Sequence, residues 1–114
     1  MPCAMISSNT KLDDNAARAF TMEISKVIAR VMGKPEAYCM VGYQHSTMVF
    51  GGVDTPCAFV QLSAIGGIDA AKNNLTSKAL TEAVAKYLQI EANRVYITFN
   101  DVKSYNWGFN GSTF

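Results

Sequence analysis

Charge is scarce and balanced in this sequence. Only 17% of the 114 residues are Asp, Glu, Lys or Arg, and ten scattered basic residues face nine acidic ones for a formal charge of +1. This balance argues against nucleic acid or an anionic membrane as the partner. No run of about 18 apolar residues occurs, and no basic segment followed by a long apolar stretch stands at the N-terminus. We therefore expect no membrane insertion and a cytoplasmic protein, with secretion, if it occurs, by a non-classical route.

Cysteine and histidine are scarce as well. Cys3, Cys39 and Cys57 have irregular spacings that fit neither a disulfide framework nor paired zinc knuckles, and they are typical of reduced thiols. His45 is the only histidine, and no Ser, His and Asp spacing of a nucleophilic triad accompanies it. A metal site built from these four residues is an alternative that the spacing disfavours. We expect no metal, no cofactor and no triad-type hydrolase.

Apolar residues are plentiful, at 49% of the chain, which suffices for one core without disulfide or metal staples. Sliding the sequence against itself by 56 positions matches residue class throughout, so that Ile24, for example, falls on Leu80. The pattern predicts a single domain over 1–114, with an internal pseudo-repeat that divides it into 1–56 and 57–114. Each half is expected to be a β-α-β unit.

Capping residues and hydrophobic periodicity predict the elements. The first helix is expected to begin after Asp13 or Asp14 and to end at Gly33, and the second to begin near Asp69. Strands are expected over 3–8, 38–43, 58–64 and 94–100. Two right-handed units in one sheet give an α+β fold of two layers: a four-stranded sheet with two helices on one face.

The sheet face away from the helices is predicted to be too apolar for water and too polar for a monomer core. Alternation along the strands assigns eight residues to it: Met5, Ser7, Met40, Phe59, Gln61, Ser63, Tyr96 and Thr98. We infer that this face meets other subunits.

Pro2 is the most unusual candidate for chemistry. If Met1 is removed, the chain begins with a secondary amine that can act as a base. The apolar strand that follows would order and bury this terminus, and burial beside a lysine would lower its pKa toward or below the α-amino range of about 7.7–8.0. A frayed terminus is the alternative.

Seven short motifs carry a resemblance that spans the chain in order. They are Met1-Pro2, Gly33-Lys34-Pro35, Phe50-Gly51-Gly52, Pro56-Cys57-Ala58, Ile65-Gly66-Gly67, Arg94-Val95-Tyr96-Ile97 and the terminal segment from Trp107 to Phe114. With these motifs the sequence resembles the macrophage migration inhibitory factor family of the tautomerase superfamily.

The resemblance implies a homotrimeric barrel and keto-enol tautomerism of phenylpyruvate-like or dopachrome-like compounds, which are small aromatic keto or enol acids. Pro2 would be the catalytic base. Lys34 and the backbone amide of Ile65 would hold the substrate's carboxylate or enolate oxygen, and Tyr96 of a neighbouring subunit would close the pocket. The resemblance implies six further pocket residues: Tyr38, Ser63, Thr98, Trp107, Phe109 and Phe114.

The sequence departs from the vertebrate members at several of these positions. Thr98 stands where they carry asparagine, Ser63 where they carry histidine, and Trp107 and Phe109 replace a smaller aliphatic residue and a tryptophan, so the substrate range stays open. Their Cys-x-x-Cys motif is reduced to one cysteine, and its disulfide chemistry is not expected here. Two alternatives are a cytokine-like secreted ligand of a cell-surface receptor with a vestigial pocket, and a trimeric scaffold without either role.

Overall fold

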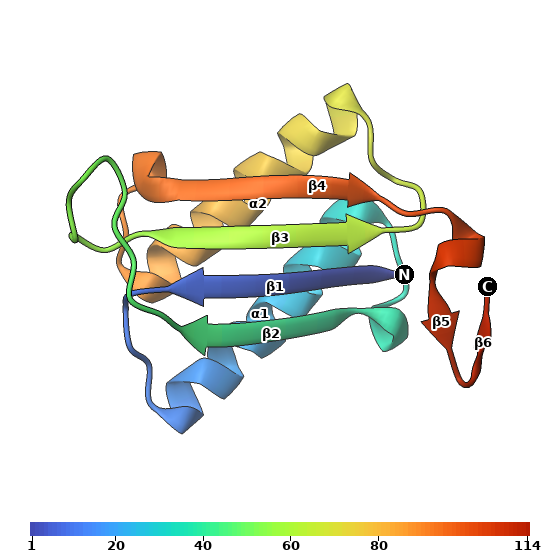
Figure 1. Cartoon of the computed structure of the whole chain (residues 1–114), viewed down its shortest axis with the longest axis horizontal. Coiled ribbons are helices and arrows are strands. Elements are labelled where there is room, and N and C mark those ends of the chain that lie inside the picture. The colour runs from blue at the N-terminus through green and yellow to red at the C-terminus, as the bar shows by residue number, and fades with distance from the viewer.

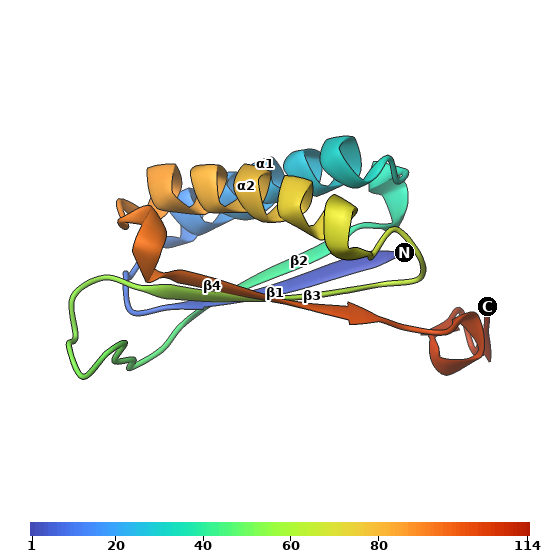
Figure 2. The ribbon, with the colours of Figure 1, turned by 90° about the horizontal axis from the view of Figure 1, so that it is seen from above.

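Two helices pack side by side on one face of a mixed four-stranded sheet (Figures 1 and 2). The computed structural model describes all 114 residues. Its strands are β1 (Pro2–Ser8), β2 (Met40–His45), β3 (Ala58–Ala64) and β4 (Val95–Asp101), and its helices are α1 (Asp14–Met32) and α2 (Ala70–Leu88). The sheet order is β2-β1-β3-β4, with β1 parallel to β2, β3 parallel to β4, and the central pair antiparallel. The expected α+β class and its sheet are confirmed.

The C-terminal segment adds a small hairpin beside the N-terminus of the chain (Figure 1). Its strands are β5 (Gly108–Phe109) and β6 (Ser112–Thr113). Three short 3-10 helices complete the fold: η1 (Glu36–Tyr38), η2 (Ala92–Arg94) and η3 (Ser104–Asn106). Neither α-helix is long and apolar enough to cross a membrane.

The helix ends follow from local side-chain chemistry. Asp13 and Asp69 are the N-caps, and a carboxylate oxygen of each accepts a hydrogen bond of 2.8 Å from a main-chain N–H in the first helical turn. Gly33 ends α1 in the left-handed conformation at φ 63°, as expected. Gln89 ends α2 in the same conformation at φ 54°, so the sequence has no glycine that would predict this helix end.

One hydrophobic core fills the space between the helices and the sheet. Both central strands alternate buried and more exposed residues, so that Ala4, Ile6, Val60 and Leu62 point into the core. Phe20 of α1 is fully buried among them. Each large apolar side chain buried in this way contributes about 1.5–3 kcal/mol relative to exposure. The helix-facing half of the predicted alternation is thus confirmed for the central strands.

The opposite sheet face is open in the single chain. Met5, Met40 and Tyr96 are 46%, 65% and 63% exposed, although all three are large and apolar or aromatic. Figure 2 shows nothing packed on this side of the central strands. Exposed apolar side chains gathered on one face mark an association surface.

Several strand boundaries differ from the prediction: the first strand begins one residue earlier, at Pro2, and the two edge strands cover Met40–His45 and Val95–Asp101 instead of 38–43 and 94–100. The second strand begins at Met40 rather than Tyr38, because the chain first makes the η1 turn, in which the main-chain N–H of Tyr38 donates to Pro35 and that of Cys39 to Glu36. The last strand begins at Val95, since Arg94 still belongs to η2. Each short turn reorients the chain as it enters an edge strand.

Candidate functional site

A cavity of about 430 Å³ opens where the chain's N-terminus meets its C-terminal hairpin. It is lined by five residues that the sequence assigned to the site, namely Pro2, Tyr38, Trp107, Phe109 and Phe114. Their positions in sequence are far apart, and β1, η1 and the hairpin bring them together. We call this space the Pro2 cavity.

Aromatic rings form one wall of the Pro2 cavity. The rings of Tyr38 and Phe109 meet edge to face, with centroids 5.8 Å apart. The Phe109 ring stacks on that of Phe114, with centroids 5.4 Å apart and an interplanar angle of 11°. Both arrangements are favourable for aromatic pairs. The wall is suited to a flat aromatic ligand.

Lys34 supplies a cation close to this cavity. It follows Gly33, which ends α1, and its Nζ donates a 2.8 Å hydrogen bond to the carbonyl oxygen of Ile65. A β-carbon at position 67 would lie only 3.3 Å from Lys34 Cε, so Gly67 gives the lysine room to pass. Lys34 is half-buried, where a charge interacts more strongly than in open water.

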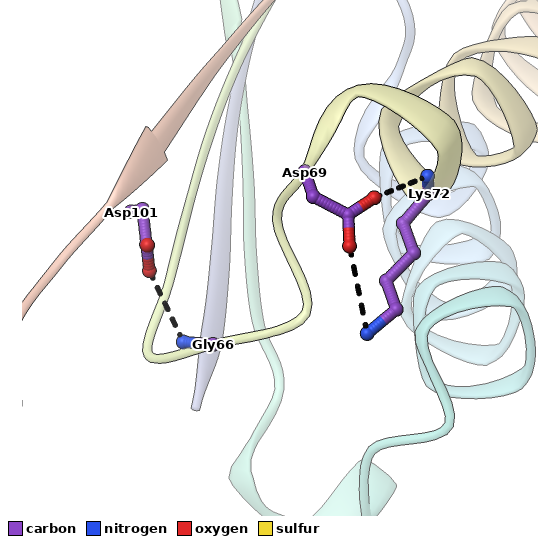
Figure 3. A network of polar contacts seen from close by, with 4 residues as sticks. All are labelled: Gly66, Asp69, Lys72 and Asp101. Atoms are coloured by element: carbon purple, nitrogen blue, oxygen red, sulfur yellow. Dashed lines mark hydrogen bonds and ion pairs between the residues drawn. The ribbon is translucent and has the colours of Figure 1, made fainter.

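The turn after β3 presents the main-chain N–H of Ile65. Gly66 and Gly67 both adopt positive φ, at 73° and 78°. Asp101 at the end of β4 accepts a 3.2 Å hydrogen bond from the N–H of Gly66, which ties this turn to the sheet (Figure 3). The Ile65 N–H itself donates no hydrogen bond within the chain. It is a fixed donor available to a ligand oxygen.

The same turn leads into α2 through a second polar contact (Figure 3). Asp69 caps the helix and also forms an ion pair with Lys72, whose Nζ lies 3.8 Å away. Both side chains are more than half exposed, so the ion pair contributes little to stability. The cap holds the end of the turn that begins at Ile65.

The free amine at the cavity belongs to Met1, which is present in the structure. Burial, and secondly the nearby Lys34 ammonium, lowers the pKa of this amino group below its ordinary value of 8.0. Pro2 itself is fully buried, and its nitrogen is part of the Met1–Pro2 amide. The environment of the N-terminus therefore favours a neutral amine.

Sequence reasoning missed several residues of the cavity. Cys3, Ala37, Cys39 and Met40 also line it. Their places follow from the parallel pairing of β1 with β2, which sets Cys3 opposite Met40, and a register of this kind is not readable from a motif. Burial raises the pKa of both the Cys3 and the Cys39 thiol, so both are poor nucleophiles at neutral pH.

Tyr96 and Thr98 do not join this cavity in the single chain. Pro2 lies opposite Ala64 at one end of β3, whereas Tyr96 lies opposite Phe59, five residues away along the strand. This offset corresponds to about 17 Å. Ser63 pairs with the strand residue next to Pro2 and is near the cavity, but Thr98 pairs at mid-strand with its side chain on the open face.

Tyr96 instead lines a second cavity, of about 500 Å³, at the far end of the sheet. Phe50, Phe59 and Met48 share its lining, which is almost wholly apolar. We call this space the Tyr96 cavity. Figure 1 shows that the connection between β2 and β3 lies at that end, opposite the N-terminus and the hairpin.

The comparisons with known proteins agree along the whole chain. The model of the family described as macrophage migration inhibitory factor matches residues 1–114. A macrophage migration inhibitory factor homolog of Trichuris trichiura is 38% identical, with all of both chains covered, and the macrophage migration inhibitory factor of Xenopus tropicalis is 36% identical, covering all of this chain and 99% of its own. Among solved structures, that of the Toxoplasma gondii macrophage migration inhibitory factor superposes with a TM-score of 0.93 at 34% identity, over 98% of this chain and 99% of that one.

Proposed function

The chain belongs to the macrophage migration inhibitory factor family, and on that premise we propose that it is a keto-enol tautomerase of phenylpyruvate-like or dopachrome-like compounds. The observation that carries the proposal is the Pro2 cavity. The fully buried Pro2 and an aromatic wall line it. Lys34 and the unused N–H of Ile65 adjoin it, because Ile65 follows Ala64, the strand partner of Pro2, and Lys34 binds the Ile65 carbonyl oxygen. These are the groups that proton transfer at the carbon beside a carbonyl requires.

Pro2 is the catalytic base once Met1 has been removed. Its neutral nitrogen takes a proton from the carbon beside the keto group, and the electron pair of the broken carbon–hydrogen bond forms the double bond of an enolate. The enolate oxygen then takes a proton, which restores the neutral amine when Pro2 supplies it. The low-polarity surroundings and the Lys34 charge, which lower the pKa of the Met1 amine, act on a Pro2 amine in the same way.

Lys34 and Ile65 hold the oxygens of the substrate. The Lys34 ammonium pairs with the carboxylate, and the free Ile65 N–H donates to the oxygen on which charge develops. A fixed main-chain donor needs no reorganisation during the reaction, so it stabilises the enolate more than the ground state. The aromatic ring of the substrate lies against Phe109 and its neighbours.

The active site is completed in a homotrimer. Its subunits cover the open sheet face and bring the partner subunit's Tyr96 to the Pro2 cavity. Within one chain, about 17 Å of β3 separates Pro2 from Tyr96, so one subunit does not supply both groups to one site. Met5 and Met40 are exposed in the single chain, and this supports a trimer that buries their face of the sheet.

Light scattering at micromolar concentration measures the assembly. We expect one species of about 37 kDa, which is three chains of 12.4 kDa. A single species with the mass of one chain would contradict both the trimer and the shared site.

Substitution of Lys34 tests the binding of the carboxylate. With Met1 removed, Lys34→Ala is expected to lose about 1.5–3 kcal/mol of transition-state stabilisation on phenylpyruvate, or roughly 10- to 150-fold in kcat/KM, because a charged hydrogen bond is lost. The methyl ester of phenylpyruvate lacks the charge and should lose much less. Lys26→Ala, which removes an exposed lysine from α1, is the matched control. Equal losses on acid and ester would show that Lys34 does not bind the carboxylate.

A further inference from the structure

The connection between β2 and β3, residues 46–57, is an irregular loop that is tied to the rest of the chain by side-chain hydrogen bonds. Only one turn closes within it, where Phe50 and Val53 exchange two main-chain hydrogen bonds around two glycines of positive φ. A loop of this length without regular structure leaves many carbonyl groups to be satisfied from outside. Two side chains from distant parts of the chain provide the donors.

Arg94, just before β4, is the first of these side chains. Its guanidinium donates to four carbonyl oxygens of the 46–57 loop: those of Pro56 (3.0 Å), Thr55 (3.1 Å), Phe50 (3.2 Å) and Val53 (3.2 Å). No carboxylate forms an ion pair with it, since the one ion pair in the chain joins Lys72 and Asp69. The charge of Arg94 is therefore directed entirely at the loop.

Asn9, just after β1, is the second. Its amide nitrogen donates to the carbonyl oxygens of Asp54 (3.0 Å) and Thr55 (3.2 Å), and its Oδ1 accepts a 2.9 Å hydrogen bond from the N–H of Cys57. Arg94 and Asn9 thus hold the 46–57 loop from the ends of two different strands, β4 and β1. Together they form a clamp that needs no regular secondary structure in the loop.

The clamp extends to the aromatic lining of the Tyr96 cavity. The Arg94 guanidinium lies 5.2 Å from the centroid of the Phe50 ring, at cation–π distance. The Phe50 ring lies 4.5 Å from that of Tyr96. Arg94 therefore fixes both the backbone of Phe50, through its carbonyl, and the ring of Phe50, which packs on Tyr96.

From this geometry we infer that Arg94 is a positioning residue that sets the Phe50–Tyr96 ring pair as a preformed wall for aromatic substrates. The inference rests on the proposed function, in which the partner subunit's Tyr96 completes the Pro2 cavity. Arg94 does not bind substrate itself, because its guanidinium N–H groups already donate to four carbonyl oxygens of the loop. It acts by making the wall rigid before the substrate arrives, which lowers the cost of binding.

Lysine cannot replace arginine in this role. The planar guanidinium spreads its N–H groups over a fixed fork, whereas a lysine ammonium donates from one nitrogen and cannot reach four separated carbonyls at once. Arg94→Lys therefore keeps the charge and most of the side-chain length but releases part of the loop. This variant therefore tests the hydrogen bonds of the clamp while the positive charge stays in place.

The test compares an aryl and an alkyl substrate on trimers from which Met1 has been removed. Phenylpyruvate and 2-oxobutanoate are followed by exchange of their C3 hydrogens in deuterated water, for the wild type, Arg94→Lys and the control Arg18→Ala, an exposed arginine on α1. For Arg94→Lys we expect KM for phenylpyruvate to rise about three- to tenfold, the range of an aromatic contact, with kcat and the 2-oxobutanoate values little changed. The amides of Phe50, Val53 and Cys57 should also exchange faster, because the loop opens.

A second variant keeps the inference testable if Arg94→Lys does not fold. Phe50→Leu retains the carbonyl that Arg94 binds but removes the ring that packs on Tyr96, and it should give the same selective loss on phenylpyruvate. An inactive wild type would overturn the proposed function, and the inference with it. If the wild type is active, the inference alone is overturned when both variants leave the preference for phenylpyruvate over 2-oxobutanoate unchanged. That includes the case in which the activity of both variants falls equally on the two substrates.

Discussion

Protein that retains Met1 is expected to fold and to trimerise normally but to lose tautomerase activity by about 10²–10⁴-fold, the contribution of a positioned general base. With Met1 in place the Pro2 nitrogen is a tertiary amide, whose lone pair is delocalised into the carbonyl and has no useful basicity. Met1 also lines the Pro2 cavity and takes up part of its volume. Intact mass assigns each preparation, and an enol-keto assay on phenylpyruvate compares the two.

An alanine inserted between Met1 and Pro2 gives a matched control, because its N-terminus is processed to a free amine that is not on the proline. If the protein without Met1 is no more active than the protein that retains Met1 or the alanine insertion, Pro2 is not the base.

The pH dependence of the processed protein follows from the same environment. The neutral amine is the active form, so kcat/KM should rise with pH and level off above the pKa of Pro2. Burial and the Lys34 charge lower the pKa of the Met1 amine from 8.0, and they should lower that of Pro2 from the ordinary α-amino range in the same direction.

The helices were predictable from the sequence because local chemistry decides where they begin and end. Asp13, Asp69 and Gly33 act through hydrogen bonds and dihedral angles within one turn of themselves. Gln89 shows the limit of this reasoning: its own side chain is exposed and does not favour the left-handed conformation, which accompanies the burial of Leu88 and Ile90 on either side of it. The η1 turn that displaced the second strand is a similar case: Tyr38 is suited to a strand by propensity, and Pro35 accepts its N–H to form the turn.

The residues of the candidate site also fall into those that a local sequence motif assigns and those that only the folded chain brings together. Pro2, Lys34 and Ile65 stand in short motifs, so resemblance to a family is enough to assign them expected roles. Arg94 also opens one of these motifs, but neither it nor Asn9, which follows an apolar strand pattern, was assigned a role by the sequence. Their side chains bind loop atoms between 38 and 48 positions away in the sequence, and only the folded sheet brings these atoms within reach.

Two inactive or weakened proteins are expected to restore one another when their subunits are mixed. The first carries the alanine insertion before Pro2, and the second carries Tyr96→Ala. If each site combines Pro2 of one subunit with the partner subunit's Tyr96, random reassembly of equal amounts into trimers gives about one quarter of sites with both groups intact, and activity should rise to about that fraction of wild type.

The geometry of the single chain is the reason to expect this result. Pro2 and Tyr96 lie at opposite ends of β3, and the rigid sheet between them cannot bring them together within one subunit. Subunits are exchanged by unfolding and refolding the mixture, and each protein refolded alone is the control. If both groups served the same subunit, no mixed trimer would contain a repaired site, and the mixture would show only the average of the two separate activities. That outcome would require the partner subunit's Tyr96 to be removed from the mechanism and would leave the Pro2 cavity to work with the aromatic wall of its own hairpin.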